Sequence, residues 1–323
     1  MKRIAILTLA IMTILSGCMS VQDVEDSDIQ TETLENPDAF IPDGLERTED
    51  GTPILKVYIA DTEKIESMDI ETYIQGVVAG EMKNDWPLEA LKAQAILART
   101  FTLKFLETKK SAFDGADIST DVSEAQAYSA ENINDRVIQA VEETRGVVMV
   151  HHGELPQAWF HAHSGGTTEL PTVALDYDSD PEYLSVSQSY DSDKAPEDVK
   201  NWEVSFTAKE IGDACASCGI QTGDCETFEI GEKGDSGRAK TFIVNGKEVS
   251  AATFRINIGA NKLKSTLIDS IDVKNGKVTI KGSGFGHGVG MSQWGAYGLA
   301  EDGATYESIV GHYFDGIEFV GLW

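Results

Sequence analysis

Two segments far apart in the chain combine glycine with side chains that can do chemistry. In the first, residues 80–95, Glu81 follows a glycine at the end of an apolar stretch. The second, residues 284–296, contains five glycines and three side chains suited to ligand binding, His287, Gln293 and Trp294. Glycine lets a backbone come close to a ligand, and a carboxyl group can transfer a proton. The two segments therefore predict a binding cleft with acid–base chemistry.

The carboxyl group of Glu81 belongs to the inward face of an expected helix. Asp69 has the side chain of a helix N-cap, and the apolar residues that follow have helical spacing: Ile70, Tyr73, Ile74, Val77 and Val78. Glu81 is the next position on that stripe, where burial would raise its pKa toward the range that a general acid needs at neutral pH. The alternative is a glutamate that only caps or pairs at the helix end.

A second helix is expected directly after this one. Pro87 lies in its first turn, and apolar residues continue to about Thr102. Lys92 and Arg99 are seven residues apart on one face. They could bring positive charge close to Glu81, or they could form an ordinary solvated edge.

The middle of the chain predicts strands at residues 147–150 and 159–161, followed by a polar turn. His161 and His163 alternate along the second strand, so both should lie on one side. Hydrogen-bonded histidines are favoured here over a metal pair, because no third ligand is in view. Ser164 lacks the strand-to-helix elbow of a hydrolase nucleophile, and we do not assign it that role.

The later part of the chain is expected to be irregular at residues 202–224 and to resume as strands near residues 228–230, 242–244 and 278–280. The fold class is therefore α+β, with helices concentrated in the first third and mixed strands after it. Three cysteines, Cys215, Cys218 and Cys225, fall within a Cys-bearing insert at about 200–227. One local disulfide with a remaining thiol is the simpler expectation, and a zinc site is the alternative.

The N-terminus indicates export. A basic start and an apolar run that ends before Cys18 predict a signal peptide over residues 1–18. The small residues before Cys18 resemble a bacterial lipobox, which implies lipidation of Cys18 and a protein anchored to a membrane at the cell envelope; a plain signal peptide is the alternative. Residues 19–50 hold eleven acidic side chains against one basic side chain and predict a disordered acidic linker.

The charge of the chain excludes one class of partner. The formal net charge is -28 and the isoelectric point is about 4.4. Phosphate binding needs a basic surface, so we expect no nucleic acid partner. Residues 51–323 are long enough for one large domain or two small ones with a well-buried core.

The two opening segments, together with the block from His161 to Glu169, resemble the stage II sporulation protein D (SpoIID/LytB) family. The three blocks occur in the family's order and cover the chain from about Val57 to Trp323. The resemblance implies a lytic transglycosylase that acts on peptidoglycan glycan strands lacking stem peptides. Related members are described as amidase enhancers, so a cell-wall amidase is a further expected partner. A role in sporulation does not follow from the resemblance alone.

The resemblance also assigns the site. Glu81 would be the catalytic acid, and a larger set would bind substrate: Lys92, Gln94, Arg99, Gln126, His161, Ser164, Gly165, Thr168, His287, Gln293 and Trp294. Some members carry zinc on two cysteines, but Ser119 and Ala125 stand at those positions here. We therefore expect no metal at that place and no other cofactor.

One carboxyl group is enough for the implied reaction. The acid protonates the bridging oxygen and then, as a base, deprotonates the primary hydroxyl of the muramic acid, which closes a 1,6-anhydro ring. Ordinary glycosidases need two carboxylates. Two alternatives remain: a cell-wall-binding module that stimulates a separate amidase, and a metal-dependent hydrolase that uses the histidines and cysteines.

Overall fold

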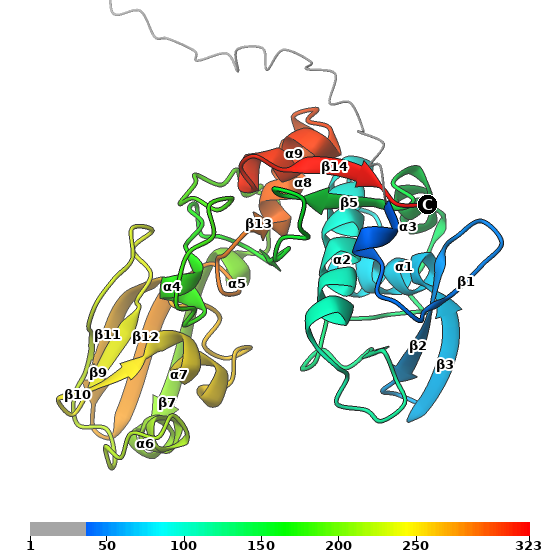
Figure 1. Cartoon of the computed structure of the whole chain (residues 1–323). Coiled ribbons are helices and arrows are strands. Elements are labelled where there is room, and N and C mark those ends of the chain that lie inside the picture. The colour runs from blue at the N-terminus through cyan, green and yellow to red at the C-terminus, as the bar shows by residue number, and fades with distance from the viewer. Residues whose placement is uncertain (1–36) are drawn as a thin grey trace, which may run out of the picture. The chain divides into compact units, whose positions relative to one another are not determined.

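The computed structural model describes residues 37–323 (Figure 1). The signal peptide, Cys18 and residues 19–36 of the expected linker lie outside the described residues. The helices are η1 (Pro37–Phe40), α1 (Ile70–Glu81), α2 (Leu88–Thr108), α3 (Asp135–Glu143), α4 (Pro171–Ala174), α5 (Glu197–Lys200), α6 (Ala208–Ser217), α7 (Ala251–Ile258), α8 (Gln293–Glu301) and α9 (Tyr306–Tyr313).

The strands form several small sheets. They are β1 (Glu46–Arg47), β2 (Pro53–Ile59), β3 (Lys64–Asp69), β4 (Ile118–Ser119), β5 (Val147–Val150), β6 (Phe160–His161), β7 (Asn201–Thr207), β8 (Phe228–Ile230), β9 (Thr241–Val244), β10 (Lys247–Ser250), β11 (Ile268–Lys274), β12 (Lys277–Ser283), β13 (Met291–Ser292) and β14 (Glu318–Gly321). The mixed α+β class expected from the sequence is confirmed, although α8 and α9 add helices near the C-terminal end.

Helix α2 is the centre of the first hydrophobic core. It packs against α1, α3, α8, α9 and β5, and Figure 1 shows these elements around it. Its buried positions lie on all sides of the helix, which is the pattern of a helix enclosed by other elements. Helix α1 begins as expected, because the Asp69 side chain accepts a hydrogen bond from the Thr72 backbone at 3.0 Å. The cap sets the start of the helix that ends at Glu81.

The folded part begins earlier than the expected boundary at residue 51. Ile41 is buried in the first core, and β1 pairs with β2 in an antiparallel register. Strands β2 and β3 form the rest of this sheet, with β4 added parallel to β2. Residues 37–50 of the acidic stretch thus belong to the folded part, because Ile41 supplies apolar area and the β1 backbone is paired.

A second hydrophobic core lies within residues 202–280. One sheet has the order β11-β12-β7 and another the order β10-β9-β8, and α6 packs against α7, β7 and β12. Three phenylalanines, Phe228, Phe242 and Phe254, meet edge to face with ring centroids 5.1 to 5.6 Å apart. Such aromatic contacts add to the burial of their large apolar area.

The expectation of irregular structure at residues 202–224 is wrong. Most of this stretch forms β7 and α6. Thr207 and Glu210 make a capping box at the start of α6, in which each side chain bonds the other residue's backbone. This Thr-x-x-Glu signal was present in the sequence and marks a helix start. Trp202 and Phe206 are buried from one side of the strand before it.

The three cysteines in the described part of the chain are free thiols. Burial raises the pKa of Cys225 to about 11, which keeps this thiol protonated at neutral pH. Among residues 37–323, no group of three or more histidine, cysteine or acidic side chains is placed to hold a metal ion. No helix in the same range is long and apolar enough to cross a bilayer.

Candidate functional site

Glu81 is the last residue of α1, and its carboxyl group is held by donors from two other parts of the chain. The backbone N–H of Ala127 donates to Oε1 at 2.7 Å. The side-chain amide of Gln293, the first residue of α8, donates to Oε2 at 3.3 Å. Two segments 46 and 212 residues distant in the chain thus meet at one carboxyl group.

Two glycines in α1 allow the Ala127 backbone to come this close. A methyl group added at Gly80 would lie 2.6 Å from the Tyr128 backbone nitrogen, and one added at Gly76 would lie 2.1 Å from the Tyr128 ring. Real side chains do not tolerate such distances, so the spacing of the two glycines makes the groove that receives residues 127–128.

The surroundings raise the pKa of the Glu81 carboxyl group. Burial is the main cause, because removal from water disfavours the charged form. The hydrogen bonds from Ala127 and Gln293 act in the opposite direction without cancelling it. A carboxyl group with a raised pKa keeps its proton closer to neutral pH and can act as a general acid.

Two further glutamines adjoin this carboxyl group. Gln94 of α2 is fully buried, and its Oε1 accepts from the Gln293 amide at 3.4 Å. Gln126 is buried beside α2, where its amide lies 3.3 Å from the Thr102 hydroxyl. Gln94 Nε2 and Gln126 Oε1 have no hydrogen-bond partner among the described residues. Gln94 thus reaches the Glu81 carboxyl group through Gln293, whereas Gln126 contacts α2.

Glu81 opens onto a surface pocket of about 440 Å³. The lining combines apolar and polar side chains from the end of α1, the turn before α2 and the loop before α3: Ala79, Gly80, Glu81, Met82, Lys83, Asn84, Asp85 and Asn132. Asp85 is the only other carboxylate among these lining residues, and Lys83 is the only cation. The site thus offers one acid with a raised pKa beside an open space.

Lys92 and Arg99 are both predicted to bind substrate. In the structure, each of them forms an ion pair with acidic side chains of the protein. Lys92 pairs with Glu89 at 2.7 Å and with Glu143 at 2.6 Å. Arg99 is fully buried, and its guanidinium donates to both carboxylate oxygens of Glu71, at 3.0 and 2.6 Å. The enclosed guanidinium holds α2 to α1, and its role in substrate binding stays a prediction.

The block that begins at His161 is not part of the pocket lining either. His161, Ser164 and Thr168 are buried, and Gly165 adopts a positive φ of 73° in the turn between them. The Nδ1 atom of His161 lies 3.1 Å from the Val289 carbonyl oxygen, and burial lowers the pKa of this histidine to about 3. These side chains thus contribute to the packing of the protein, and their contact with substrate stays a prediction.

The glycine-rich segment packs its backbone against the block that begins at His161. Gly286, Gly288 and Gly290 have positive φ, and the Val289 N–H donates to His287 Nδ1 at 3.0 Å. Burial holds the pKa of His287 well below its ordinary value, so the ring is neutral.

Trp294, which the resemblance assigns to substrate binding, is largely covered by other aromatic side chains. It is 8 % exposed. Its ring packs against Trp86 at 4.5 Å and Tyr297 at 5.2 Å between centroids. The aromatic cluster fixes α8 against the turn that precedes α2.

Sequence reasoning missed four residues that hold the site together: Glu71, Ala127, Asp191 and Arg238. Glu71 pairs with Arg99, and Ala127 acts through its backbone. Asp191 and Arg238 are buried among the turns that precede α8. Of these four residues, only Glu71 had a recognisable sequence pattern, that of an acidic residue in the first turn of a helix.

The fold and the site define a class of protein: an α+β domain that presents one helix-end glutamate to a surface pocket, with support from a glycine-rich segment and a second core. A family model described as stage II sporulation protein (SpoIID) matches residues 58–151, and a domain of unknown function matches residues 170–290. The first match contains Glu81, and the second contains the second hydrophobic core.

The relatives extend the match over most of the chain. An uncharacterised protein of Brachyspira hyodysenteriae is 30 % identical over 89 % of this chain and 76 % of its own length. Stage II sporulation protein D of Bacillus subtilis is 29 % identical over 82 % of this chain and 78 % of its own length. The amidase enhancer of Bacillus subtilis is 29 % identical over 75 % of this chain but only 39 % of its own length. The chain belongs to the SpoIID family.

Proposed function

We propose that this protein is an exported peptidoglycan lytic transglycosylase, tethered to a membrane through Cys18, that cleaves glycan strands lacking stem peptides. Family membership and the amidase-enhancer relative support a cell-wall-related role. The observation that carries the finer proposal is the Glu81 carboxyl group, whose pKa burial raises beside an open pocket. A reaction that uses a single carboxyl group requires such an acid next to a space for the substrate.

In this reaction Glu81 acts twice. Its proton passes to the glycosidic oxygen as the bond to the muramic acid C1 breaks. The resulting carboxylate then takes the proton of the muramic acid's primary hydroxyl, whose oxygen bonds to C1 and closes the 1,6-anhydro ring. Glu81 gives up one proton and takes one back, and no water is consumed. The N–H of Ala127 stabilises the carboxylate between the two steps, because it donates to Oε1 in the charged form.

A second candidate is a cell-wall-binding module that stimulates an amidase. The specific observation in its favour is the relative named amidase enhancer. Both candidates would use the same pocket, and they differ in whether Glu81 has to transfer a proton.

The test compares the wild-type fragment of residues 37–323 with Glu81→Gln and Asp85→Asn on purified glycan strands, with and without stem peptides. Mass spectrometry of the products is the measurement. We expect anhydro ends from the wild type and Asp85→Asn, and none from Glu81→Gln. Reducing ends that depend on both carboxylates would indicate a two-carboxylate hydrolase instead. Strand binding without any cleavage would favour the amidase-stimulating module.

The membrane tether has its own test. Cys18→Ser should move the protein from the membrane fraction to the soluble fraction and leave cleavage in solution unchanged. Immunoblots of fractionated cells measure this, and a variant that stays with the membrane would remove the lipid-anchor proposal.

A further inference from the structure

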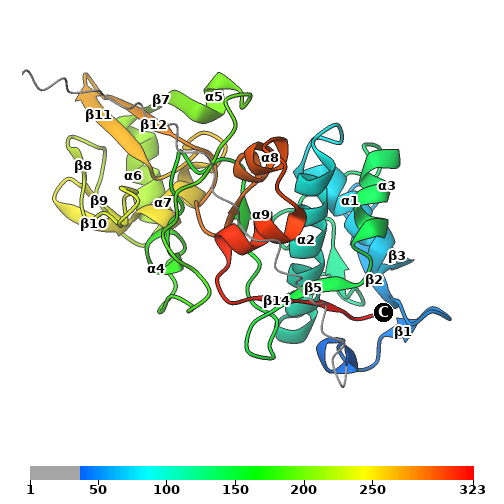
Figure 2. The same ribbon diagram turned by 90° about the horizontal axis from the view of Figure 1, so that it is seen from above.

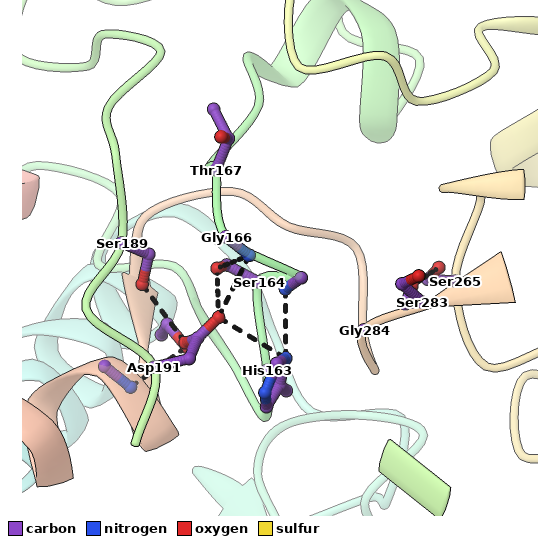
Figure 3. Close-up of polar contacts among 12 residues, drawn as sticks. His163, Ser164, Gly166, Thr167, Ser189, Asp191, Ser265, Ser283 and Gly284 are labelled. Carbon is purple, nitrogen blue, oxygen red and sulfur yellow. Dashed lines mark hydrogen bonds and ion pairs between the residues drawn. The ribbon is translucent and has the colours of Figure 1, made fainter. Parts of the chain in front are cut away.

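Asp191 is a buried carboxylate outside every motif that the sequence suggested. Its Oδ2 atom accepts hydrogen bonds from the Ser164 hydroxyl and, at 3.2 Å, from the Gly166 N–H. Its Oδ1 atom accepts from the Ser189 hydroxyl at 3.1 Å and from the Ser292 hydroxyl. Figure 3 shows this carboxylate between Ser189 and the turn formed by Ser164 and Gly166. A buried charge with four donors is unlike a surface acid and needs an explanation.

The environment keeps Asp191 charged. Burial by itself raises the pKa of this carboxyl group, but the nearby His163 ring and the hydrogen bonds from Ser164 and Ser292 outweigh it and lower the pKa. The His163 Nδ1 atom, 3.3 Å from Oδ2, accepts the Gly165 N–H at 3.0 Å. The His163 ring lowers the pKa of Asp191 only while it is protonated. In the neutral ring this nitrogen is an acceptor, and the hydroxyl and backbone donors then hold the carboxylate.

One of these donors begins the helix that reaches Glu81. Ser292 is fully buried and is the N-cap of α8, where its hydroxyl oxygen accepts the Gly295 N–H at 3.2 Å. A negative charge beside a helix N-terminus is favourable, because the first N–H groups of the helix point toward it. Gln293 follows Ser292 directly and donates to Glu81. Asp191, Ser292, Gln293 and Glu81 thus form a continuous chain of contacts.

Neighbouring backbone contacts hold the same point. Ser292 pairs with His161 where β13 lies parallel to β6, and the Trp294 N–H donates to the Ala162 carbonyl at 3.0 Å. The Ser192 N–H donates to the Trp294 carbonyl at 3.1 Å. Figure 2 shows α8 from above, with α9 and α2 beside it. The start of α8 is therefore held by the segments on both sides of the Asp191 carboxylate.

Nucleophilic chemistry does not explain the arrangement. Ser164 is fully buried, and its hydroxyl donates to the carboxylate, with no histidine nitrogen in place to accept its proton. A metal site does not explain it either, because Asp191 belongs to no metal-binding group among residues 37–323.

We propose that Asp191 and Ser292 are positioning residues that fix the N-terminus of α8 and, through Gln293, the carboxyl group of Glu81. This inference rests on the proposed function, in which Glu81 is the catalytic group. Loss of the Gln293 contact removes a donor from the Glu81 carboxylate, which disfavours its charged form and raises its pKa.

The experiment titrates Glu81 directly. The full-length chain in detergent micelles carries carboxyl-¹³C glutamate, and the Glu81 signal is assigned by its loss in Glu81→Gln. Gln293→Leu shows the full effect of removing the donor, and Ser292→Ala and Asp191→Asn test the positioning. In Asp191→Asn a single acceptor oxygen faces four donors, so the cluster cannot be completed. Ser292→Ala is decisive because it changes no charge.

The matched control is Ser250→Ala. Ser250 is also a helix N-cap, at α7, where it accepts the Thr253 N–H at 3.1 Å and donates to an aspartate, Asp176. The Ser250→Ala substitution removes an N-cap comparable to Ser292, and this N-cap has no contact with the Glu81 site. A purely structural role for Ser292 would lower the melting temperature as Ser250→Ala does and leave the Glu81 titration alone.

We expect the Glu81 pKa to rise by about 0.5 pH unit in Gln293→Leu and by much of that amount in Ser292→Ala and Asp191→Asn. Ser250→Ala should titrate as the wild type does. A wild-type Glu81 pKa in Ser292→Ala would overturn the inference, and so would an unchanged pKa in Gln293→Leu. If the wild type titrates as expected but cleaves no glycan, the proposed function fails while the positioning inference is still decided by the titration.

Discussion

At the scale of single residues, Glu81 lies where burial of a charged carboxylate is unfavourable. The same burial favours the protonated form, which a general acid needs. It ends a helix whose inward side chains are apolar except for Glu71, which pairs with Arg99, and burial raises the pKa of the Glu81 carboxyl group. Two donors hold the carboxyl group in place, and one of them is the backbone N–H of Ala127.

Because the pKa of Glu81 is raised, stability should depend on pH in a defined direction. Above the ordinary value of 4.5 and below the raised pKa, the folded chain keeps a proton that the unfolded chain has released. The free energy of unfolding therefore falls as the pH rises through this window. Glu81→Gln lacks this loss, so its melting temperature minus that of the wild type should increase between about pH 5 and about pH 8.

Thermal unfolding by circular dichroism at several pH values measures this difference. Asp85→Asn is the matched control, because Asp85 is an exposed carboxylate that lines the same pocket. A difference between Glu81→Gln and the wild type that stays constant with pH would contradict the raised pKa.

Arg99 and Lys92 lie on the same helix but differ in burial. We therefore expect their substitution to lower the free energy of unfolding by unequal amounts. Arg99→Met removes one partner of a buried ion pair and leaves Glu71 without its cation, which should cost about 3–5 kcal/mol. Lys92→Met removes a pair whose acids are partly exposed, which should cost about 0–1 kcal/mol. Urea unfolding measures both variants, and similar small losses would show that the Arg99 pair contributes little.

At the scale of elements, the contact between α1 and the loop at residues 127–128 depends on a missing side chain. Gly80 faces the Tyr128 backbone, and Ala127 in the same loop donates to Glu81. Helix propensity alone would make alanine at this position stabilising, but the steric conflict is with backbone and cannot be relieved by a side-chain rotation.

Gly80→Ala should therefore destabilise the protein by about 1–3 kcal/mol and weaken glycan cleavage by about tenfold or more, because the loop and its donor to Glu81 are displaced. Gly311→Ala is the control: this glycine lies in α9 with nothing within 4 Å of the added methyl group. It should gain about 0.5–1 kcal/mol. Urea unfolding and product analysis test the pair, and a stabilised Gly80→Ala variant would contradict the close approach.

At the scale of the whole molecule, Arg238 connects the second hydrophobic core to the turns that support the site. Its guanidinium donates to the Thr167 carbonyl at 2.7 Å and to the Ser164 carbonyl. A methyl group at Gly288 would lie 2.4 Å from its Nε, so the glycine-rich segment also closes over this side chain. Burial lowers the pKa of Arg238 to about 10, and it remains charged at neutral pH.

Arg238→Met should cost about 3 kcal/mol or more, because two buried carbonyl groups lose their charged donor. It should also increase amide hydrogen exchange at residues 164–168. Arg255→Met is the control, since Arg255 is partly buried but bonds the carbonyl groups of Ala260, Leu263 and Lys264. Exchange measured by mass spectrometry should rise at 164–168 only in Arg238→Met, and equal exchange in both variants would contradict the connection.

The sequence by itself determined the local elements and the family. The N-cap Asp69, the apolar stripe of α1 and the inward position of Glu81 are short-range features, because each depends on neighbours within one or two helical turns. The start of α2 after Pro87 and the strand at residues 147–150 are confirmed for the same reason. The three motif blocks led to the SpoIID family, which the relatives confirm.

Only the tertiary structure decided which of these features meet. Gln293 donates to a carboxyl group 212 residues away, and Arg99 pairs with Glu71 inside the protein. Asp191 accepts hydrogen bonds from hydroxyl groups of three segments. Spacing along the chain shows which face of an element a side chain occupies, but it does not show what packs against that face. Long-range partners are selected by close packing and by the need to satisfy each buried polar group, and both act only once the chain has folded.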